Sequence, residues 1–181
     1  MKIPLIVCAV VVLATCSISG LQMAQAQDSS EAISSIRQRY AAINQNLPKC
    51  KTVKKKLSGF STEGGELIAY SEGSALRKIV ARFYGETGRA LEEYYYWDDQ
   101  LQFVYRKEDR YSEPMSGKVT NTTETRFYFD KGELIRWLDG EGKPMRRGSD
   151  EFTEQQKKHL SNSEIFVAGA RATKATVEAP E

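Results

Sequence analysis

The stretch EYYYWDDQLQFVY, residues 93–105, predicts a β-hairpin and with it the fold class. Six of its thirteen residues are aromatic, a composition typical of strands, and the acidic pair Asp98-Asp99 lies in the middle. Aspartate is a good turn former, so we interpret the pair as a two-residue turn and not as catalytic carboxylates. Residues whose numbers sum to 197 then face each other, as Tyr96 faces Leu101.

Alternation gives this hairpin two different faces, because successive side chains of a strand point to opposite sides of the sheet. The first face is apolar enough to form the core and carries Tyr94, Tyr96, Leu101, Phe103 and Tyr105. The second is mixed and carries Leu91, Glu93, Tyr95, Trp97, Gln100, Gln102, Val104 and Arg106. An antiparallel sheet can leave one face to water, so Tyr95, Trp97 and Gln102 are candidate binding residues. The alternative is that Tyr95 and Trp97 only stabilise the sheet through cross-strand pairs.

Four further segments alternate with turn residues in the same way. Gly, Asp and Glu clusters at residues 85–88, 130–132 and 139–142 separate segments rich in aromatic and β-branched residues. Short turns join antiparallel neighbours. We therefore predict an α+β fold around an antiparallel meander sheet of about six strands, over residues 65–71, 75–84, 90–97, 100–111, 123–129 and 133–138.

Two helices complete the predicted domain. From Ser29 apolar residues recur at spacings of three and four, which indicates a helix that Pro48 ends. The apolar stripe of this helix consists of Ile33, Ile36, Tyr40, Ile43 and Leu47. Ser149 or Asp150 caps a second helix over residues 151–161, with an extension through residues 165–167 left open. We expect both helices to cover the same face of the sheet.

The N-terminus has the features of a secretory signal peptide. Lys2 precedes an apolar run over residues 3–14, too short to span a membrane, and Ala24-Gln25-Ala26 fits a signal peptidase site. We predict a signal peptide over 1–26, a single α+β domain over 27–170 and a disordered tail over 171–181. Export would place the protein in the periplasm or outside the cell. Alternatively, the lipobox-like sequence LATC that ends at Cys16 would direct lipid to Cys16 and anchor the chain to the cell envelope.

Two groups of basic residues are candidate contacts for anions. The first follows the first helix and consists of Lys49, Lys51, Lys54, Lys55 and Lys56. It could meet an anionic surface, although a solvated linker explains it as well. In the second group, a three-residue turn at 130–132 would set Arg126 opposite Arg136. Like charges placed face to face are unfavourable, so either acidic neighbours or a bound anion must offset them.

The sequence carries no catalytic signature. Its single histidine, His159, adjoins lysines on the second predicted helix, and no zinc-binding pattern, Gly-rich phosphate loop or G-x-S-x-G motif occurs. We expect no cofactor, no metal and no enzymatic activity; the alternative is a weak carboxylate hydrolase that uses Glu92, Glu93 or Glu133. Lys2 is the only charged residue of the first 26, so the mature chain would carry 25 basic and 24 acidic residues. That balance argues against nucleic-acid binding.

The hairpin unit recurs along the chain. Residues 127–134, FYFDKGEL, repeat residues 95–101, YYWDDQL, with one residue inserted, and residues 64–70, GGELIAY, are a looser third copy. This pattern of an aromatic segment, a turn and Gly-Glu-Leu resembles the MORN-like repeats of some bacterial antitoxin-component and cell-surface proteins. The resemblance covers about residues 64–139. It implies a row of β-hairpins in an elongated sheet. The dense glycines of full MORN units are absent, so lipid binding is not implied. The mature chain is also similar in layout to exported bacterial proteins of uncharacterised function.

The leading hypothesis is an exported binding or interaction module that uses the open aromatic face of the sheet. Its partner would be a protein or a glycan, because exposed Trp and Tyr with polar neighbours are good contact residues. The alternative is an envelope-associated structural protein, held by lipid on Cys16 or by the lysines of residues 49–56. We expect no transmembrane span in the mature chain, and peripheral membrane contact is compatible with either hypothesis.

Overall fold

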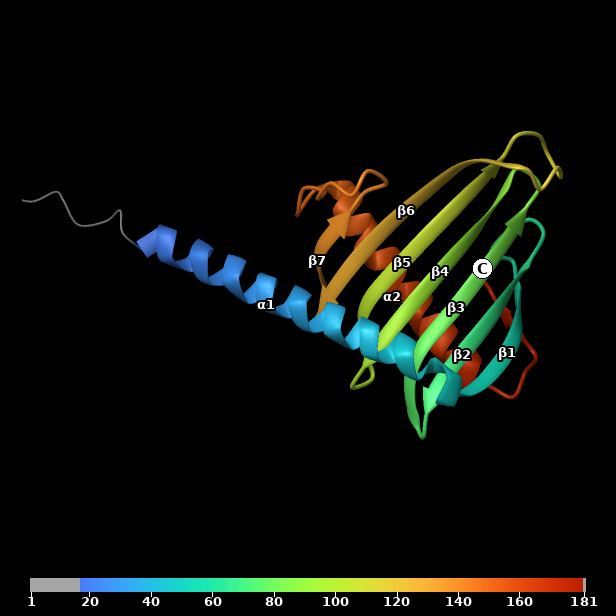
Figure 1. Ribbon diagram of the computed structural model, residues 1–181, viewed down its shortest axis with the longest axis horizontal. Helices are drawn as coiled ribbons and strands as arrows, with labels where there is room; N and C mark the ends of the chain where they lie inside the picture. Colours follow the sequence, from blue (N-terminus) through green and yellow to red (C-terminus); the bar gives the residue numbers. More distant parts are fainter. Residues whose placement is uncertain (1–16, 181) are drawn as a thin grey trace, which may run out of the picture.

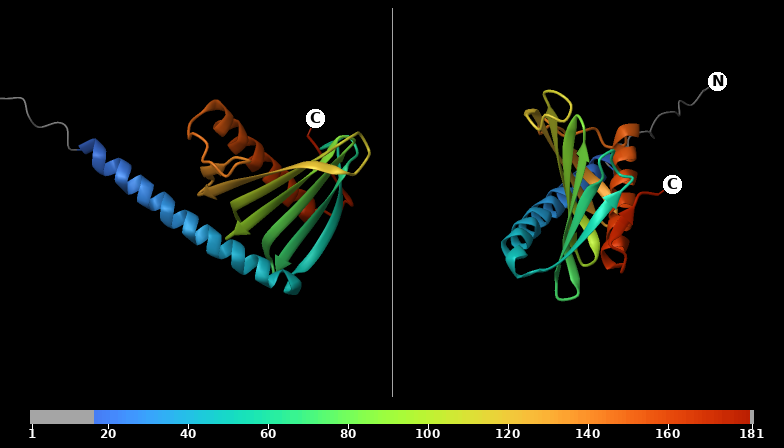
Figure 2. Two further views of the ribbon diagram at one scale, coloured as in Figure 1. Left: turned by 45° about the horizontal axis from the view of Figure 1, so that its top comes forward. Right: turned by 90° about the vertical axis from the view of Figure 1, so that its right-hand side faces the viewer.

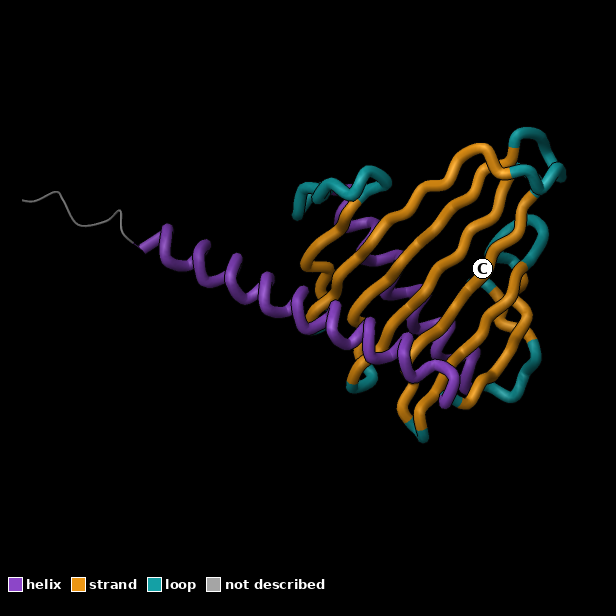
Figure 3. The backbone as a smooth tube through the Cα atoms, viewed as in Figure 1, coloured by secondary structure: helices purple, strands orange, loops and turns teal. Residues whose placement is uncertain are grey.

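The computed structural model describes residues 17–180 and confirms an α+β fold around a mostly antiparallel meander sheet (Figure 1). The sheet has eight strands, two more than expected, in the order β7-β6-β5-β4-β3-β2-β1-β8. The strands are β1 (Lys51–Ser58), β2 (Gly65–Glu72), β3 (Ala75–Gly85), β4 (Gly88–Trp97), β5 (Gln100–Tyr111), β6 (Val119–Asp130), β7 (Glu133–Leu138) and β8 (Thr176–Glu178). Strands β1 to β7 pair antiparallel in chain order, whereas β8 pairs parallel with β1. Loops lie at the two ends of the strands (Figure 3).

The two helices, α1 (Ser17–Asn46) and α2 (Asp150–Arg171), lie on opposite faces of the sheet (Figure 2). Helix α2 confirms the second predicted helix together with its extension, and Ser149 caps it by accepting a hydrogen bond from the Phe152 backbone N–H. The prediction that both helices share one face was wrong. Each face of the sheet carries aromatic side chains that must be covered, so one helix cannot shield both.

Helix α1 begins at Ser17, and the predicted start at Ser29 was therefore wrong. Residues 17–28 contain Ala, Gln, Leu and Met, which favour helix, and only one glycine to weaken it. The predicted cleavage site after Ala26 falls within α1. Cys16 and the apolar run over residues 3–14 lie outside the described residues. The helix ends before a 3-10 turn, Leu47–Lys49, that contains Pro48.

The turn between β4 and β5 has the predicted length. Asp98 and Asp99 have φ angles of 49° and 57°, which are the left-handed values required at both central positions of a two-residue hairpin turn. Tyr96 lies opposite Leu101, as the turn predicts. The acidic pair is therefore explained by backbone geometry.

One residue further into the hairpin, a β-bulge shifts the pairing. Tyr95 faces Phe103 and Tyr94 faces Val104, which leaves Gln102 as the extra residue of β5. The prediction that Tyr94 and Phe103 share a face was wrong for this reason, because a one-residue slip moves a side chain to the other side of the sheet.

Two apolar cores result from this arrangement. The first lies between the sheet and α2, and its largest fully buried side chains include Tyr94, Phe127, Phe129, Phe166, Leu67, Ile79 and Leu134. The second lies between the sheet and α1 and consists of Ile33, Ile36, Ile43, Tyr95, Phe103 and Tyr128. Burying one such side chain contributes about 1.5–3 kcal/mol, so the smaller core stabilises the packing of α1 on the sheet.

The expected linker and the expected disordered tail instead form one edge of the sheet. Strand β1 contains four lysines, yet alternation lets it bury Leu57 while Lys54 and Lys56 stay exposed. Strand β8 pairs with β1 and buries Val177 against α2. At Gly169 of α2 an added Cβ would lie 2.4 Å from Val177 Cγ2, so only glycine allows this close approach.

We expect Val177→Ala to lower the free energy of unfolding by about 1–3 kcal/mol, because it removes buried methyl groups at the contact between β8 and α2. Val119→Ala is the matched control, since Val119 is exposed and its truncation should change stability by less than about 0.5 kcal/mol. Urea unfolding of both variants measures the difference. Equal midpoints would mean that β8 does not dock.

Candidate functional site

The crevice between α1 and the sheet contains the best candidate binding site. It is a pocket of about 300 Å³, which we call the helix–sheet pocket. Helix α1 crosses the sheet near the β4–β5 turn, which places its polar flank beside β5 and β6 (Figure 1). The pocket is lined by Ile36, Arg37 and Tyr40 of α1, Phe103 and Tyr105 of β5, and Glu124, Arg126 and Tyr128 of β6.

Aromatic rings form the walls of the helix–sheet pocket. Tyr40 meets Phe103 edge to face at a centroid distance of 5.4 Å, and Phe103 meets Tyr128 at 4.9 Å. These contacts fix the orientation of the rings before any ligand arrives. Tyr40 remains 40% exposed and forms the outer lip of the pocket. A flat or apolar group entering here would meet aromatic surface on two sides.

Two guanidinium groups and one carboxylate lie at the rim. Arg37 lies over the Tyr128 ring at 5.9 Å, and Arg126 lies over the Tyr105 ring at 5.6 Å. Arg126 Nη2 also donates to Glu124 Oε2 at 2.8 Å, so one carboxylate neutralises one of the two cations. The pocket therefore carries a net positive charge, which favours an anionic group on a ligand.

Tyr105 is a neutral hydrogen-bonding group in this pocket. Burial, followed by its hydrogen bond to Glu124 and the charge of that carboxylate, raises the pKa of Tyr105 to about 12. The phenol stays protonated across the physiological range. It therefore adds polarity to the pocket without adding negative charge.

Tyr95 and Gln102 are not on an open face, although both were predicted binding residues. Tyr95 is 1% exposed because α1 lies over it, and its hydroxyl donates to Glu93 Oε2 at 2.6 Å. Gln102 is buried at the bulge, where its side-chain oxygen accepts a bond of 2.5 Å from Arg39 Nη1. The expectation of an open face was wrong at this end of the sheet, because the apolar stripe of α1 covers it.

Trp97 lies beside the covered region and is half-buried. The guanidinium of Arg39 lies 5.4 Å from the centre of a Trp97 ring, and that of Arg77 lies 4.7 Å from it. Both cations thus contact the indole within the usual cation–π range. Trp97 acts here as a support for α1 and β3 and is separate from the residues that line the helix–sheet pocket.

Arg126 and Arg136 do not face each other. Lys131 and Gly132 form a two-residue turn, and a bulge at Ile135 shifts the register, so Arg126 lies opposite Leu138 and Arg136 opposite Tyr128. The predicted three-residue turn was wrong, and the direct cross-strand opposition of the two arginines that was inferred from it does not occur. Of the predicted binding residues on the sheet, Arg126 lines the helix–sheet pocket and the other four do not.

The predicted lysine cluster is divided between the two faces of the sheet. Lys54 and Lys56 point to the side of α1, whereas Lys55 points to the side of α2 and donates to the Ala172 and Lys174 carbonyls at 2.8 and 2.6 Å. Lys49, in the 3-10 turn, and Lys51, at the start of β1, are both exposed. The five residues therefore do not form one continuous surface.

A buried polar cluster lies under α2 and was not anticipated. Glu92 accepts hydrogen bonds from Arg106 and, at 2.5 Å, from the Tyr94 hydroxyl. His159 Nδ1 lies 3.4 Å from that hydroxyl, and the buried Nε2 has no partner among the residues that the structure describes. Spacing could have revealed His159, because it lies seven residues from both Phe152 and Phe166 on the face that packs against the sheet.

Burial dominates the electrostatics of this cluster. It lowers the pKa of His159 from 6.5 to about 4, against an opposing effect of Glu92. Burial also disfavours the charged form of Glu92, but the Arg106 charge and the Tyr94 hydrogen bond oppose this effect, and the pKa of Glu92 lies below its usual value. The histidine is therefore neutral and the carboxylate charged at neutral pH.

The three carboxylates considered for catalysis do not converge. Glu92 lies under α2, whereas Glu93 lies on the opposite face and forms an ion pair with Lys78 at 2.9 Å. Glu133 is exposed at the start of β7. Catalytic carboxylates flank a substrate across one cleft. These side chains share no cleft, so the structure provides no support for that alternative.

We expect acid to destabilise the protein through His159. The folded state protonates His159 near pH 4 and the unfolded state near pH 6.5, so the unfolded chain binds the proton first as the pH falls. This contribution to the free energy of unfolding is fully present above pH 6.5 and is lost towards pH 4. The loss is about 3 kcal/mol, because each unit of difference between the folded and unfolded pKa corresponds to about 1.36 kcal/mol. His159→Gln should remove this part of the pH dependence, as measured by urea unfolding between pH 7 and 4. Parallel curves for the two proteins would contradict the assignment.

Comparisons with models of protein families, with curated proteins and with solved structures found no match. No helix between residues 17 and 180 is long and apolar enough to cross a membrane. Within the same range, no group of three or more His, Cys, Asp or Glu side chains is placed to hold a metal ion. The functional argument therefore rests on the geometry of the chain itself.

Proposed function

We propose that the protein is an exported, non-enzymatic binding module that takes a small amphipathic anion in the helix–sheet pocket. The observation that carries the proposal is the combination of aromatic walls with two arginines at the rim of one concave site. The proposal keeps the binding role expected from the sequence, but it moves the site from an open face to the border of α1.

The size and lining of the helix–sheet pocket suit a small ligand. Its volume of about 300 Å³ lies at the lower end of the range of about 300–1,000 Å³ typical of small-molecule sites. Such sites are usually apolar with a few polar groups that orient the ligand, and here Arg37, Arg126 and Tyr105 provide those groups. An aromatic or alicyclic body would contact Tyr40 and Phe103 while a carboxylate or sulfonate meets the arginines.

Helix α1 gives the site a wall that is separate from the sheet. Its apolar contacts come from Ile33, Ile36 and Ile43, and its polar contacts include the bond from Arg39 to Gln102. A ligand that bridges Tyr40 and Arg126 would tie α1 more firmly to β6. Binding should therefore raise the unfolding temperature, and the rise should increase with the fraction of protein that holds ligand.

Export is the second part of the proposal. It is supported by Lys2, the apolar run over residues 3–14 and the Ala24-Gln25-Ala26 sequence. Cleavage after Ala26 would leave Ile33 and every later contact of α1 with the sheet in the mature chain. The binding site is thus compatible with removal of the N-terminal segment.

We expect anilinonaphthalene sulfonate, an aromatic anion, to bind the purified protein and to gain fluorescence. Arg126→Gln should weaken binding about tenfold, because it removes a charge-assisted contact, and Tyr40→Ala should weaken it by about three- to tenfold. Fluorescence titration gives the dissociation constants, and circular dichroism verifies the fold of each variant.

The matched controls are Arg110→Gln and Tyr70→Ala. Arg110 is an exposed arginine of β5 and Tyr70 is a half-buried tyrosine of β2, and neither lines the helix–sheet pocket. Both should bind the dye as the parent protein does. If the controls weaken binding as much as Arg126→Gln and Tyr40→Ala, or if the folded parent protein binds no dye, the proposal fails.

A further inference from the structure

A second concave site lies on the same sheet face as the helix–sheet pocket, towards the opposite end of the strands from the β4–β5 turn. It has a volume of about 330 Å³, and we call it the cationic hollow. Its lining residues are Arg82 and Tyr84 of β3, Arg89, Ala90 and Leu91 of β4, and Lys107 and Asp109 of β5. Three of these seven residues are cationic and one is acidic, so the hollow is strongly biased towards anions.

The strand register explains why the three cations gather here. Arg82 lies opposite Leu91, and Leu91 lies opposite Lys107, so the two cations flank an apolar floor at a Cα separation of about 10 Å, twice the distance between strands. Arg89 lies two residues before Leu91 on the same strand and therefore points to the same face. The three cations thus surround Leu91 on three sides.

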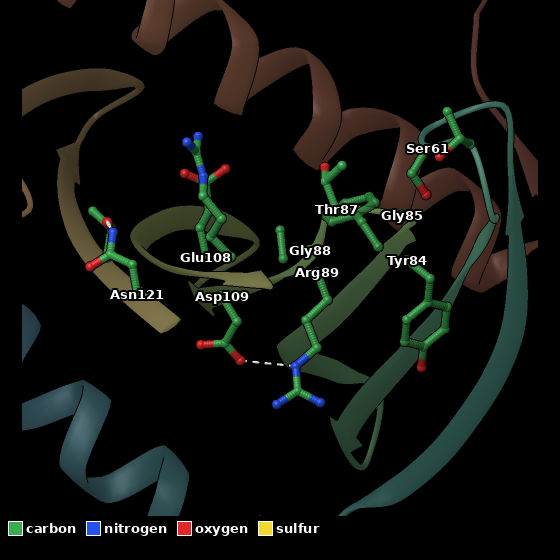
Figure 4. A pocket seen from close by; sticks show the side chains of 14 residues that line it. Ser61, Tyr84, Gly85, Thr87, Gly88, Arg89, Glu108, Asp109 and Asn121 are labelled. Carbon is green, nitrogen blue, oxygen red and sulfur yellow. Dashed lines mark hydrogen bonds and ion pairs between the residues drawn. The ribbon is translucent and has the colours of Figure 1, made fainter. Parts of the chain in front are cut away.

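Asp109 holds Arg89 in position. It is only 6% exposed and accepts hydrogen bonds from the Thr122 hydroxyl at 2.7 Å and from Arg89 Nε at 2.8 Å. Those hydrogen bonds lower the pKa of Asp109, so the carboxylate stays charged at neutral pH and the arrangement persists. Because the bond uses Nε, the two terminal nitrogens of the guanidinium point away from Asp109 (Figure 4).

The terminal nitrogens of Arg89 are available to a ligand. The Arg89 side chain is 53% exposed, and its terminal nitrogens have no hydrogen-bond or ion-pair partner in the described part of the chain. Glu108, the next residue after Lys107, points to the other side of the sheet from Arg89 (Figure 4). A guanidinium held by its Nε presents a planar fork that matches the oxygens of a phosphate.

Two other carboxylates, Glu124 and Glu66, lie near the hollow, and neither removes its excess of positive charge. Glu124 lies opposite Lys107 but accepts a hydrogen bond from Arg126, in the helix–sheet pocket. Glu66 lies opposite Arg82 at 3.7 Å, and both side chains are exposed, so solvent screens this pair. Lys107 approaches Asp109 only to 3.8 Å, which leaves its ammonium free to turn towards an anion. The hollow therefore keeps an excess of positive charge.

We propose that the cationic hollow is a phosphate-binding site, in which Arg89 grips two phosphate oxygens while Arg82 and Lys107 neutralise the remaining charge. The ligand class is a phosphate monoester, whether dissolved or carried on a lipid headgroup. Leu91 and Tyr84 would contact the organic part of the ester. The site is independent of the helix–sheet pocket, because no residue lines both.

The first test is calorimetric titration of the full chain with glycerol phosphate at low ionic strength. We expect saturable binding with one site, and Arg89→Gln should weaken it about tenfold or more. Lys131→Gln is the matched control, because it removes the same charge from the exposed β6–β7 turn, and it should leave binding unchanged. Arg89→Lys should be nearly as weak as Arg89→Gln, since lysine retains the charge but loses the fork.

Loss of Arg89 leaves Asp109 with one fewer partner, so Lys107→Gln provides a second variant in case Arg89→Gln does not fold. It should weaken binding at least about threefold while Asp109 keeps its bonds to Arg89 and Thr122. Equal binding by Lys107→Gln and Lys131→Gln would overturn the proposal.

A parallel titration distinguishes the two sources of the phosphate group. Phosphatidylcholine vesicles with and without phosphatidic acid are mixed with the protein and sedimented. Binding to glycerol phosphate that depends on Arg89 supports a dissolved ester. Binding that depends on Arg89 and occurs only on vesicles with phosphatidic acid supports a lipid headgroup. If neither probe binds, or if Arg89→Gln and Lys131→Gln behave alike towards both, the phosphate site is excluded.

Discussion

The single extra residue in β5 is the constraint on which the rest of the structure depends. Without the bulge at Gln102, Tyr94 and Phe103 would share one face and the other face would mix aromatic and polar side chains. With the bulge, Phe103 joins Tyr95 and Tyr128 on the side of α1, while Tyr94 joins Val104 and Phe127 on the side of α2. Both faces then carry aromatic side chains, and leaving these in contact with water would cost considerable free energy. The fold therefore requires a helix on each side.

The same division explains where the two candidate sites lie. Helix α1 covers only the end of its face near the β4–β5 turn, where the aromatic residues lie. Its border with the polar remainder of the face makes an amphipathic pocket. Beyond that border the side chains are charged and form cross-strand pairs such as Arg89 with Asp109 and Arg82 with Glu66. One sheet face thus changes from apolar to ionic along the strands, and each region suits a different kind of ligand.

Much of the architecture could be predicted from local patterns. The turn residues and aromatic segments located six strands, three of them to within two residues at each end and two at their observed bounds, whereas β6 begins four residues before its predicted start. The cap at Ser149 located α2. Non-local effects could not be predicted in this way. A bulge has no strong local signal in the sequence. Strand β1 has a polar sequence because lysines flank a single buried leucine. Strand β8 forms only because β1 and α2 provide its partners. For the candidate site, the sequence identified Arg126 but missed Arg37 and Glu124, whose roles depend on the path of α1 and on the β5–β6 register.

The pairing of β8 with β1 has a consequence for the order in which the chain can complete its fold. It joins residues 56–58 to residues 176–178, so the two partners are separated by nearly the whole domain. During synthesis, β1 has no neighbour on its outer side until residues 176–178 emerge. An unpaired edge is a template for association with other chains. The lysines of β1 would oppose such association by charge repulsion during that interval, so a segment with the composition of a solvated linker can protect the unfinished protein.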